Sequence, residues 1–165
     1  MTASLPLRAA ELVRELRLAP HPEGGHYREV FRSRRMVRTD DGRSERWAAT
    51  AIHFLLCVGE RRGLHRLASD EVWSWHEGAP VELLLVDQSL EATQRVLLGP
   101  AGNGSVPLRV VPAGIWQAAQ PLGEYTLAGC TVAPGFELSD LRVMAREDRT
   151  ALDFRAKHPE LAGWL

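Results

Sequence analysis

The apolar positions near the N-terminus are spaced differently from those in the rest of the chain. Between residues 6 and 17 they recur every three or four residues, as on one face of a helix, so a helix is predicted there. A second helix is predicted over about 148–157, ending before Pro159, because the residue preceding a proline disfavours helical geometry. Between the two helices the apolar residues form short runs that predict strands: 26–32, 49–58, 64–67, 71–76, 81–86, 93–98, 108–111, 115–119 and 125–132.

Glycine and proline separate these runs at fairly regular intervals, as at Gly78-Ala79-Pro80, Gly99-Pro100 and Pro112-Ala113-Gly114. Many short strands divided by such turns are typical of an all-β sandwich or barrel. No linker, repeat or low-complexity segment interrupts the pattern. We therefore predict one domain over residues 1–165, with a barrel core over about 24–145 and helices over about 6–17 and 148–157.

Composition excludes several classes of function. Hydrophobic residues make up 45% of the chain, which argues against disorder, and the net charge of −1 argues against a general nucleic-acid or membrane-surface partner. No run approaches the ~20 apolar residues that span a bilayer, and Glu11 and Glu15 make the N-terminal stretch unlike a signal peptide. Cys57 and Cys130 lie in apolar runs, which predicts buried free thiols and a cytoplasmic location, with a disulfide between them as the alternative. The basic cluster at 32–38 is interpreted as a solvated hairpin or loop.

Reactive side chains stand out in one segment, Gly59-x5-His65-x-Leu67-x3-Glu71-x6-Gly78. Because alternate side chains of a strand share a face, His65 and Glu71 on neighbouring strands are predicted to converge inside the barrel. The segment resembles the first motif of the cupin superfamily, and the segment 112–117, Pro-Ala-Gly-Ile-Trp-Gln, resembles the second.

The resemblance extends along most of the chain to a family of small cupins, a domain of unknown function. The matching segments are 20–29, 50–56, 64–73, 110–118 and 129–137. It implies a mainly β fold, the double-stranded β-helix or jelly-roll barrel, with a pocket in the barrel mouth and a homodimer as the usual assembly. It implies no particular reaction, because one fold hosts many functions.

Metal-binding members of the superfamily use three histidines and one glutamate. Here His65 and Glu71 match, whereas Leu67 and Gln117 replace the other two histidines. No metal is firmly predicted. A divalent ion (Fe, Mn, Ni or Zn) held by His65, Glu71 and either His53 or Gln117 is the alternative; a hydrogen-bonded core histidine is the other interpretation of His53.

Without a metal, His65 and Glu71 are predicted to be the catalytic pair. A carboxylate within hydrogen-bond reach would orient the imidazole and raise its pKa, which suits proton transfer near neutral pH. The string Arg62-Gly63-Leu64-His65 resembles the segment bearing the catalytic histidine of deoxysugar-nucleotide epimerases, a cupin-fold group that needs no metal. A pair kept only for internal hydrogen bonding is the competing interpretation.

The predicted substrate-binding residues are Tyr27, His53, Trp73, Trp75 and Gln117. Trp73 and Trp75 share the strand face of Glu71, and an aromatic surface beside a polar pair suits a planar or sugar-like ligand. Core packing is the alternative for each aromatic residue.

The sequence thus favours a cupin that binds a sugar-like or carboxylated metabolite, with metal-independent isomerisation or epimerisation as its hypothetical reaction. Two alternatives stay open: a metal-dependent dioxygenase or isomerase, and a non-catalytic binding or storage module. The expected partners are a small-molecule ligand and a second copy of the chain, with no nucleic acid and no membrane.

Overall fold

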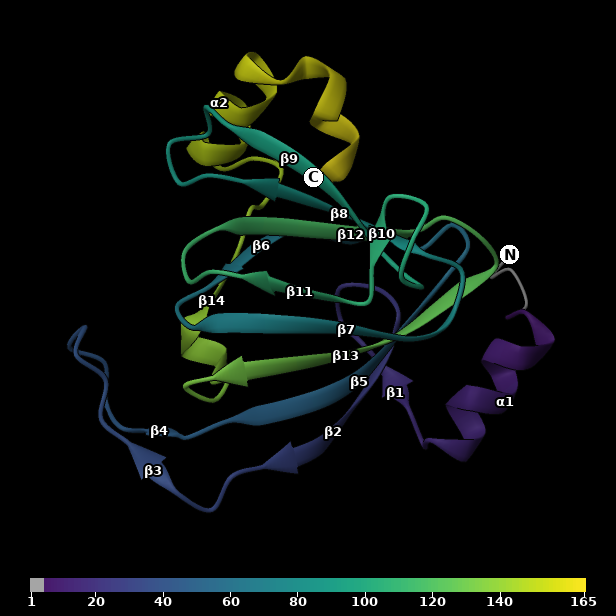
Figure 1. Cartoon of the computed structure of the whole chain (residues 1–165). Helices are drawn as coiled ribbons and strands as arrows, with labels where there is room; N and C mark the ends of the chain where they lie inside the picture. Colours follow the sequence, from purple (N-terminus) through teal and green to yellow (C-terminus); the bar gives the residue numbers. More distant parts are fainter. Residues whose placement is uncertain (1–4) are drawn as a thin grey trace.

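The computed structural model describes residues 5–165, and two six-stranded sheets form its body (Figure 1). The first sheet contains, in spatial order, β1 (Ala19–Pro20), β2 (His26–Arg32), β5 (Thr50–Cys57), β13 (Tyr125–Ala133), β7 (Asp70–Gly78) and β11 (Leu108–Val111). The second contains β10 (Ser105–Val106), β9 (Thr93–Leu98), β8 (Val81–Val86), β12 (Trp116–Pro121), β6 (Arg62–Leu67) and β14 (Leu141–Val143). From β5 to β8, and again from β11 to β14, successive strands alternate between the sheets. This topology is the predicted jelly-roll barrel.

All nine predicted strands are present, most with ends shifted by one or two residues. The strands that the pattern missed have only two or three residues, too few to show alternation: β1, β3 (Met36–Val37), β4 (Arg46–Trp47), β10 and β14. β3 and β4 pair as a hairpin that projects from the barrel, so the basic cluster lies in a solvated hairpin as predicted (Figure 1).

The main hydrophobic core lies between the two sheets. Leu83 and Leu85 of β8 point into it, while Leu84 and Val86 of the same strand pack on the opposite side under the C-terminal helices. Because both faces of β8 are buried from Leu83 to Val86, this part of the strand is continuously apolar rather than alternating.

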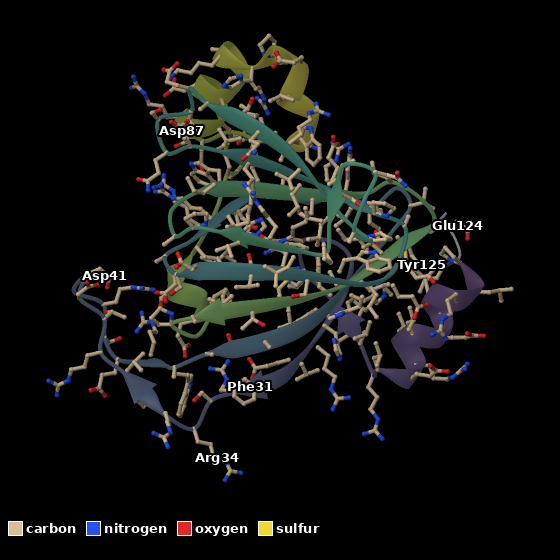
Figure 2. All side chains as sticks on the ribbon, viewed as in Figure 1. Phe31, Arg34, Asp41, Asp87, Glu124 and Tyr125 are labelled. Atoms are coloured by element: carbon tan, nitrogen blue, oxygen red, sulfur yellow. The ribbon has the colours of Figure 1, made fainter. Side chains whose placement is uncertain are left out.

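A helix covers part of each sheet's outer face. On the first sheet, α1 (Leu7–Glu15) packs Ala9 and Leu12 against Leu55. An ion pair between Arg8 and Glu77 adds to this contact, and Glu77 also accepts a hydrogen bond from the hydroxyl of Tyr125, which Figure 2 labels beside the helix.

The second sheet is covered by α2 (Arg149–Lys157) and the 3-10 helix η2 (Pro159–Trp164), which pack Phe154 and Trp164 around Trp116. A further short 3-10 turn, η1 (Leu138–Asp140), precedes β14. Both predicted helices are therefore present. None of the helices within residues 5–165 is long and apolar enough to cross a membrane.

Candidate functional site

A cavity of about 580 Å³ lies inside the barrel, within the range of roughly 300–1,000 Å³ typical of small-molecule sites. One part of its lining carries polar and ionisable side chains: His21, Glu23, Tyr27, Arg62, His65 and Glu71. Glu29, Arg32 and Thr50 also line the cavity, and Arg32 is paired with Glu29. The apolar part of the wall includes Ile52, Phe54, Leu67, Trp73, Val132 and Phe136. The cavity therefore combines a polar cluster with an apolar wall.

A β-bulge in β6 brings two of the polar residues together. His65 pairs with Gln117 and Arg62 pairs with Ala119, so three residues of β6 span the distance of two on β12. Regular alternation would place Arg62 and His65 on opposite faces, whereas with the bulge both line the cavity, and Leu64 faces the outer core. A glycine inside a strand, here Gly63, is a sequence signal for such an irregularity.

Glu71 is held in place by Gln117, which reaches it from the opposite sheet. The Gln117 amide Nε2 donates to Glu71 Oε2 at 2.6 Å, and its Oε1 accepts from Trp73 Nε1 at 2.9 Å. All three side chains are buried. Burial raises the pKa of Glu71, and the Gln117 hydrogen bond and the charge of Arg62 only partly oppose that rise.

His65 is not oriented by Glu71, which corrects the sequence-based expectation. Its Nδ1 donates instead to the carbonyl oxygen of Gly63 at 2.9 Å, and no hydrogen bond or ion pair joins it to Glu71 in residues 5–165. Burial, with a further contribution from the positive charge of Arg62, lowers the pKa of His65 to about 3 rather than raising it. Since a carbonyl only accepts, the proton is on Nδ1 and Nε2 carries a free lone pair.

Sequence reasoning did not select the group around Arg62. The Arg62 guanidinium pairs with the carboxylate of Glu23, and its Nη1 lies 3.0 Å from Nδ1 of His21. That His21 nitrogen also accepts the backbone N–H of Glu23 at 3.1 Å, so it is unprotonated. Burial, together with the charge of Arg62, lowers the pKa of His21 to about 4. The signals in the sequence were the string that contains Arg62 and His65 and the family-matching segment 20–29, which contains His21 and Glu23.

The predicted substrate-binding residues are divided between four places. Tyr27 and Trp73 line the cavity, whereas Trp75 packs in the core and donates its indole N–H to the carbonyl of Ala79. Gln117 is not among the cavity-lining residues and instead forms hydrogen bonds with Glu71 and Trp73. His53 lies on the outer face of β5, close to His76, so a role in this cavity does not fit its position. Cavity-lining residues of β5, such as Ile52 and Phe54, alternate with it.

The residues present do not match a metal-binding donor set. No group of three or more His, Cys, Asp or Glu side chains within residues 5–165 is placed to hold an ion. Leu67 lines the cavity without a donor atom, both ends of the Gln117 amide are occupied, and His53 faces away. The set of His65 and Glu71 with His53 or Gln117 is thus not assembled.

Both cysteines are free and buried, as the sequence predicts. Cys57 packs under α1, whereas Cys130 lines the cavity near Glu71, where burial raises the pKa of its thiol well above the usual value. A thiol with a raised pKa is a poor nucleophile, so we assign Cys130 no chemistry.

A two-sheet barrel whose strands alternate between sheets around an internal polar pocket defines the class of double-stranded β-helix proteins. The family model described as "Cupin superfamily (DUF985)" matches residues 10–144. The chain belongs to this family.

Solved structures agree with this assignment. A hypothetical protein from Leishmania major is 30% identical, with a TM-score of 0.81, over 93% of this chain and 94% of that one. A protein from Shewanella oneidensis is 29% identical, with a TM-score of 0.82, over 95% and 96%. An oxalate decarboxylase from Bacillus subtilis shares the fold alone, with 19% identity and a TM-score of 0.58 over 90% of this chain and 37% of that one. The search of curated proteins found no match.

Proposed function

We propose that the protein binds a small organic molecule in the barrel cavity and catalyses a proton transfer on it, as in an isomerisation or epimerisation. One observation carries the proposal: His65 and Glu71 both line the cavity, and burial shifts the pKa of each without their being bonded to each other. Two titratable groups with displaced pKa values in one pocket are the usual arrangement for an acid and a base.

The local hydrogen bonds suggest the role of each group. With its proton fixed on Nδ1 by Gly63, neutral His65 offers Nε2 to take a proton from an activated C–H of the ligand, because an imidazole of lowered pKa is a weak base. Glu71, whose pKa is raised by burial, is the group that returns a proton to another atom or face of the ligand. Such a step moves protons only and needs no oxidant.

A non-catalytic binding module remains the second candidate, favoured by a specific observation. His65 is hydrogen-bonded to Gly63 and Glu71 to Gln117, so each buried side chain already has a partner within the protein in the absence of a substrate. Binding without turnover is therefore the outcome that distinguishes this candidate from the enzyme.

Native mass spectrometry of the purified protein identifies any molecule that stays in the cavity, and a thermal-shift screen of carboxylic acids and sugars supplies further ligands. Each ligand is then incubated with the protein in D2O. We expect deuterium to enter one C–H position, and the rate to fall at least ~10²-fold in His65→Gln and in Glu71→Gln, because each removes an acid–base group.

The matched control is His53→Gln, which removes an imidazole from the outer face of the barrel and should leave the rate unchanged. A bound ligand that never exchanges indicates the binding module. Binding and exchange that are the same in His65→Gln as in the wild type contradict both roles proposed for His65.

We also propose that the protein forms a homodimer through the outer face of the first sheet. α1 covers only part of this face, and β2 and β11 expose large apolar side chains on it: Phe31 is 53% exposed and Val110 is 44% exposed. Figure 2 shows Phe31 at the side of the molecule opposite α2. A second copy would cover this apolar surface.

Light scattering at micromolar concentration is expected to give twice the chain mass of 18.3 kDa. Phe31→Arg and Val110→Arg should shift the mass toward the monomer, because a charge then has to be buried in the interface. Leu152→Arg, at an exposed site on α2 over the second sheet, is the control and should stay dimeric. A monomer mass for the wild type contradicts the proposal.

The two cysteines support a cytoplasmic location, which we propose on that basis. Both are unpaired. Free thiols persist in a reducing compartment, whereas pairing is common in oxidising ones.

A further inference from the structure

The guanidinium of Arg62 has donors that the protein does not use. Its side chain is only 9% exposed, yet its contacts to His21 and Glu23 are all made through Nη1. Among residues 5–165 no group accepts a hydrogen bond from its Nε or Nη2, and neither atom is one of the fully buried polar atoms that lack a partner, so both keep accessible surface in this cavity-lining residue. Arginine carries five N–H donors, and those that face a cavity are available to a ligand. An arginine that lines a cavity in this state is suited to binding a ligand.

The geometry of the unused donors indicates which acidic group the ligand carries. Nε and Nη2 lie side by side on a planar guanidinium, which matches the two oxygens of a carboxylate and can bind both at once. His21 adds a donor close to the guanidinium: its Nδ1 accepts from Glu23, so its proton is on Nε2, which lies 3.4 Å from Arg62 Nη1. The polar part of the cavity thus offers an acidic head group both charge and directed hydrogen bonds.

The remaining wall argues against a sugar. Ile52, Phe54, Val132 and Phe136 line it with hydrocarbon, and the indole N–H of Trp73 is already bonded to Gln117. The polar residues among them already have partners, since Arg32 pairs with Glu29 and the Thr50 hydroxyl accepts from the backbone N–H of Phe136. A sugar would bury several hydroxyl groups against this surface without partners, and each unpaired polar group is costly. A hydrocarbon chain or aromatic ring meets no such penalty and gains from leaving water.

Taken with the proposed function, on which this inference rests, these features identify the ligand class. We propose that the cavity binds a small, mostly apolar monocarboxylate, whose carboxylate lies on Nε and Nη2 of Arg62 and whose hydrocarbon part lies against Phe54, Trp73 and Phe136. Glu23, already paired with the same guanidinium, weakens this binding by its negative charge and so sets the affinity.

Isothermal titration calorimetry with three probes tests the proposal: 4-phenylbutyrate, its neutral amide 4-phenylbutanamide, and glucose. The wild type is expected to bind the acid at least tenfold more tightly than the amide and to show no binding of glucose. Glu23→Gln should widen the preference for the acid several-fold, because a repelling charge beside the guanidinium is removed.

Arg62→Gln alone leaves the Glu23 carboxylate buried and unpaired and can unfold the protein. The informative variant is therefore the double substitution Glu23→Gln with Arg62→Gln, compared with Glu23→Gln, so that the two proteins differ only in the guanidinium. The preference for acid over amide should disappear in the double variant, while the amide binds equally to both.

Four results would overturn the inference. They are equal affinity of the wild type for acid and amide, an acid preference that survives in the double variant, binding of glucose but not of the acid, and failure to bind any of the three probes. None of these results touches the proposed proton transfer. That proposal fails if ligands found by mass spectrometry or screening bind without exchanging, or exchange independently of His65.

Discussion

Phe154→Ala is expected to lower the free energy of unfolding by about 3–5 kcal/mol. Phe154 is fully buried where α2 meets the second sheet, in one cluster with Trp116, Leu161 and Trp164. Truncation removes a large apolar surface and leaves a void that the rigid β-sheet beneath cannot close. The loss therefore includes a cavity term in addition to the transfer of hydrocarbon from water.

Urea unfolding followed by tryptophan fluorescence measures the effect. Leu152→Ala is the matched control, since Leu152 lies on the same helix but is 54% exposed, and it should lose well under half as much stability. Similar losses in both variants would mean that α2 contributes through its own helical stability and not through the packing of Phe154.

Acid is expected to destabilise the protein through His65. The pKa of His65 is about 3 in the folded state, because the imidazole is buried near Arg62, and about 6.5 in the unfolded state. Between these values the unfolded state binds more protons, so the free energy of unfolding rises with pH. The stabilisation that neutral His65 contributes is fully present above pH ~6.5. By pH ~4.5 about 2–3 kcal/mol of it is lost. His21, with a pKa of about 4, acts in the same direction.

Urea unfolding from pH 7 to pH 4.5 measures this dependence, and two substitutions separate its causes. In His65→Gln the free energy of unfolding should fall less as the pH is lowered, and the remaining fall should be the one caused by His21. Glu71→Gln should steepen the fall, because the raised pKa of Glu71 makes the folded state bind the extra proton as the pH falls. If the free energy of unfolding depends on pH equally in the wild type and both variants, the folded-state pKa values of His65 and Glu71 are not shifted by burial.

Much of the fold follows from the sequence because its signals are local. The run 81–86 follows the turn Gly78-Ala79-Pro80, and the run 93–98 ends at Gly99-Pro100. Both are strands with the predicted ends. The spacing of His65 and Glu71 likewise predicted that both side chains would face one interior, and both line the cavity. Alternation along a strand, set by backbone geometry, is sufficient for these predictions.

Other parts of the site depend on contacts that the sequence does not encode locally. The two faces of β5 are both apolar, one toward the cavity and one toward α1, so hydrophobicity could not decide whether His53 points inward. The hydrogen bonds of Gln117 to Glu71 and Trp73 join the two sheets across 46 and 44 residues of chain.

The amino-acid sequence by itself determined the class of barrel, the positions of its strands and helices, and the presence of one imidazole and one carboxylate inside it. Only the tertiary structure decided that these two groups do not touch and that Arg62, paired with Glu23, joins them in the cavity. The first follows from their hydrogen bonds, since His65 is bonded to Gly63 and Glu71 to Gln117. The physical reason that Arg62 faces the cavity is the bulge in β6. One extra residue reverses which side chains share a face, and whether a strand accommodates it is set by the neighbouring strands against which it pairs.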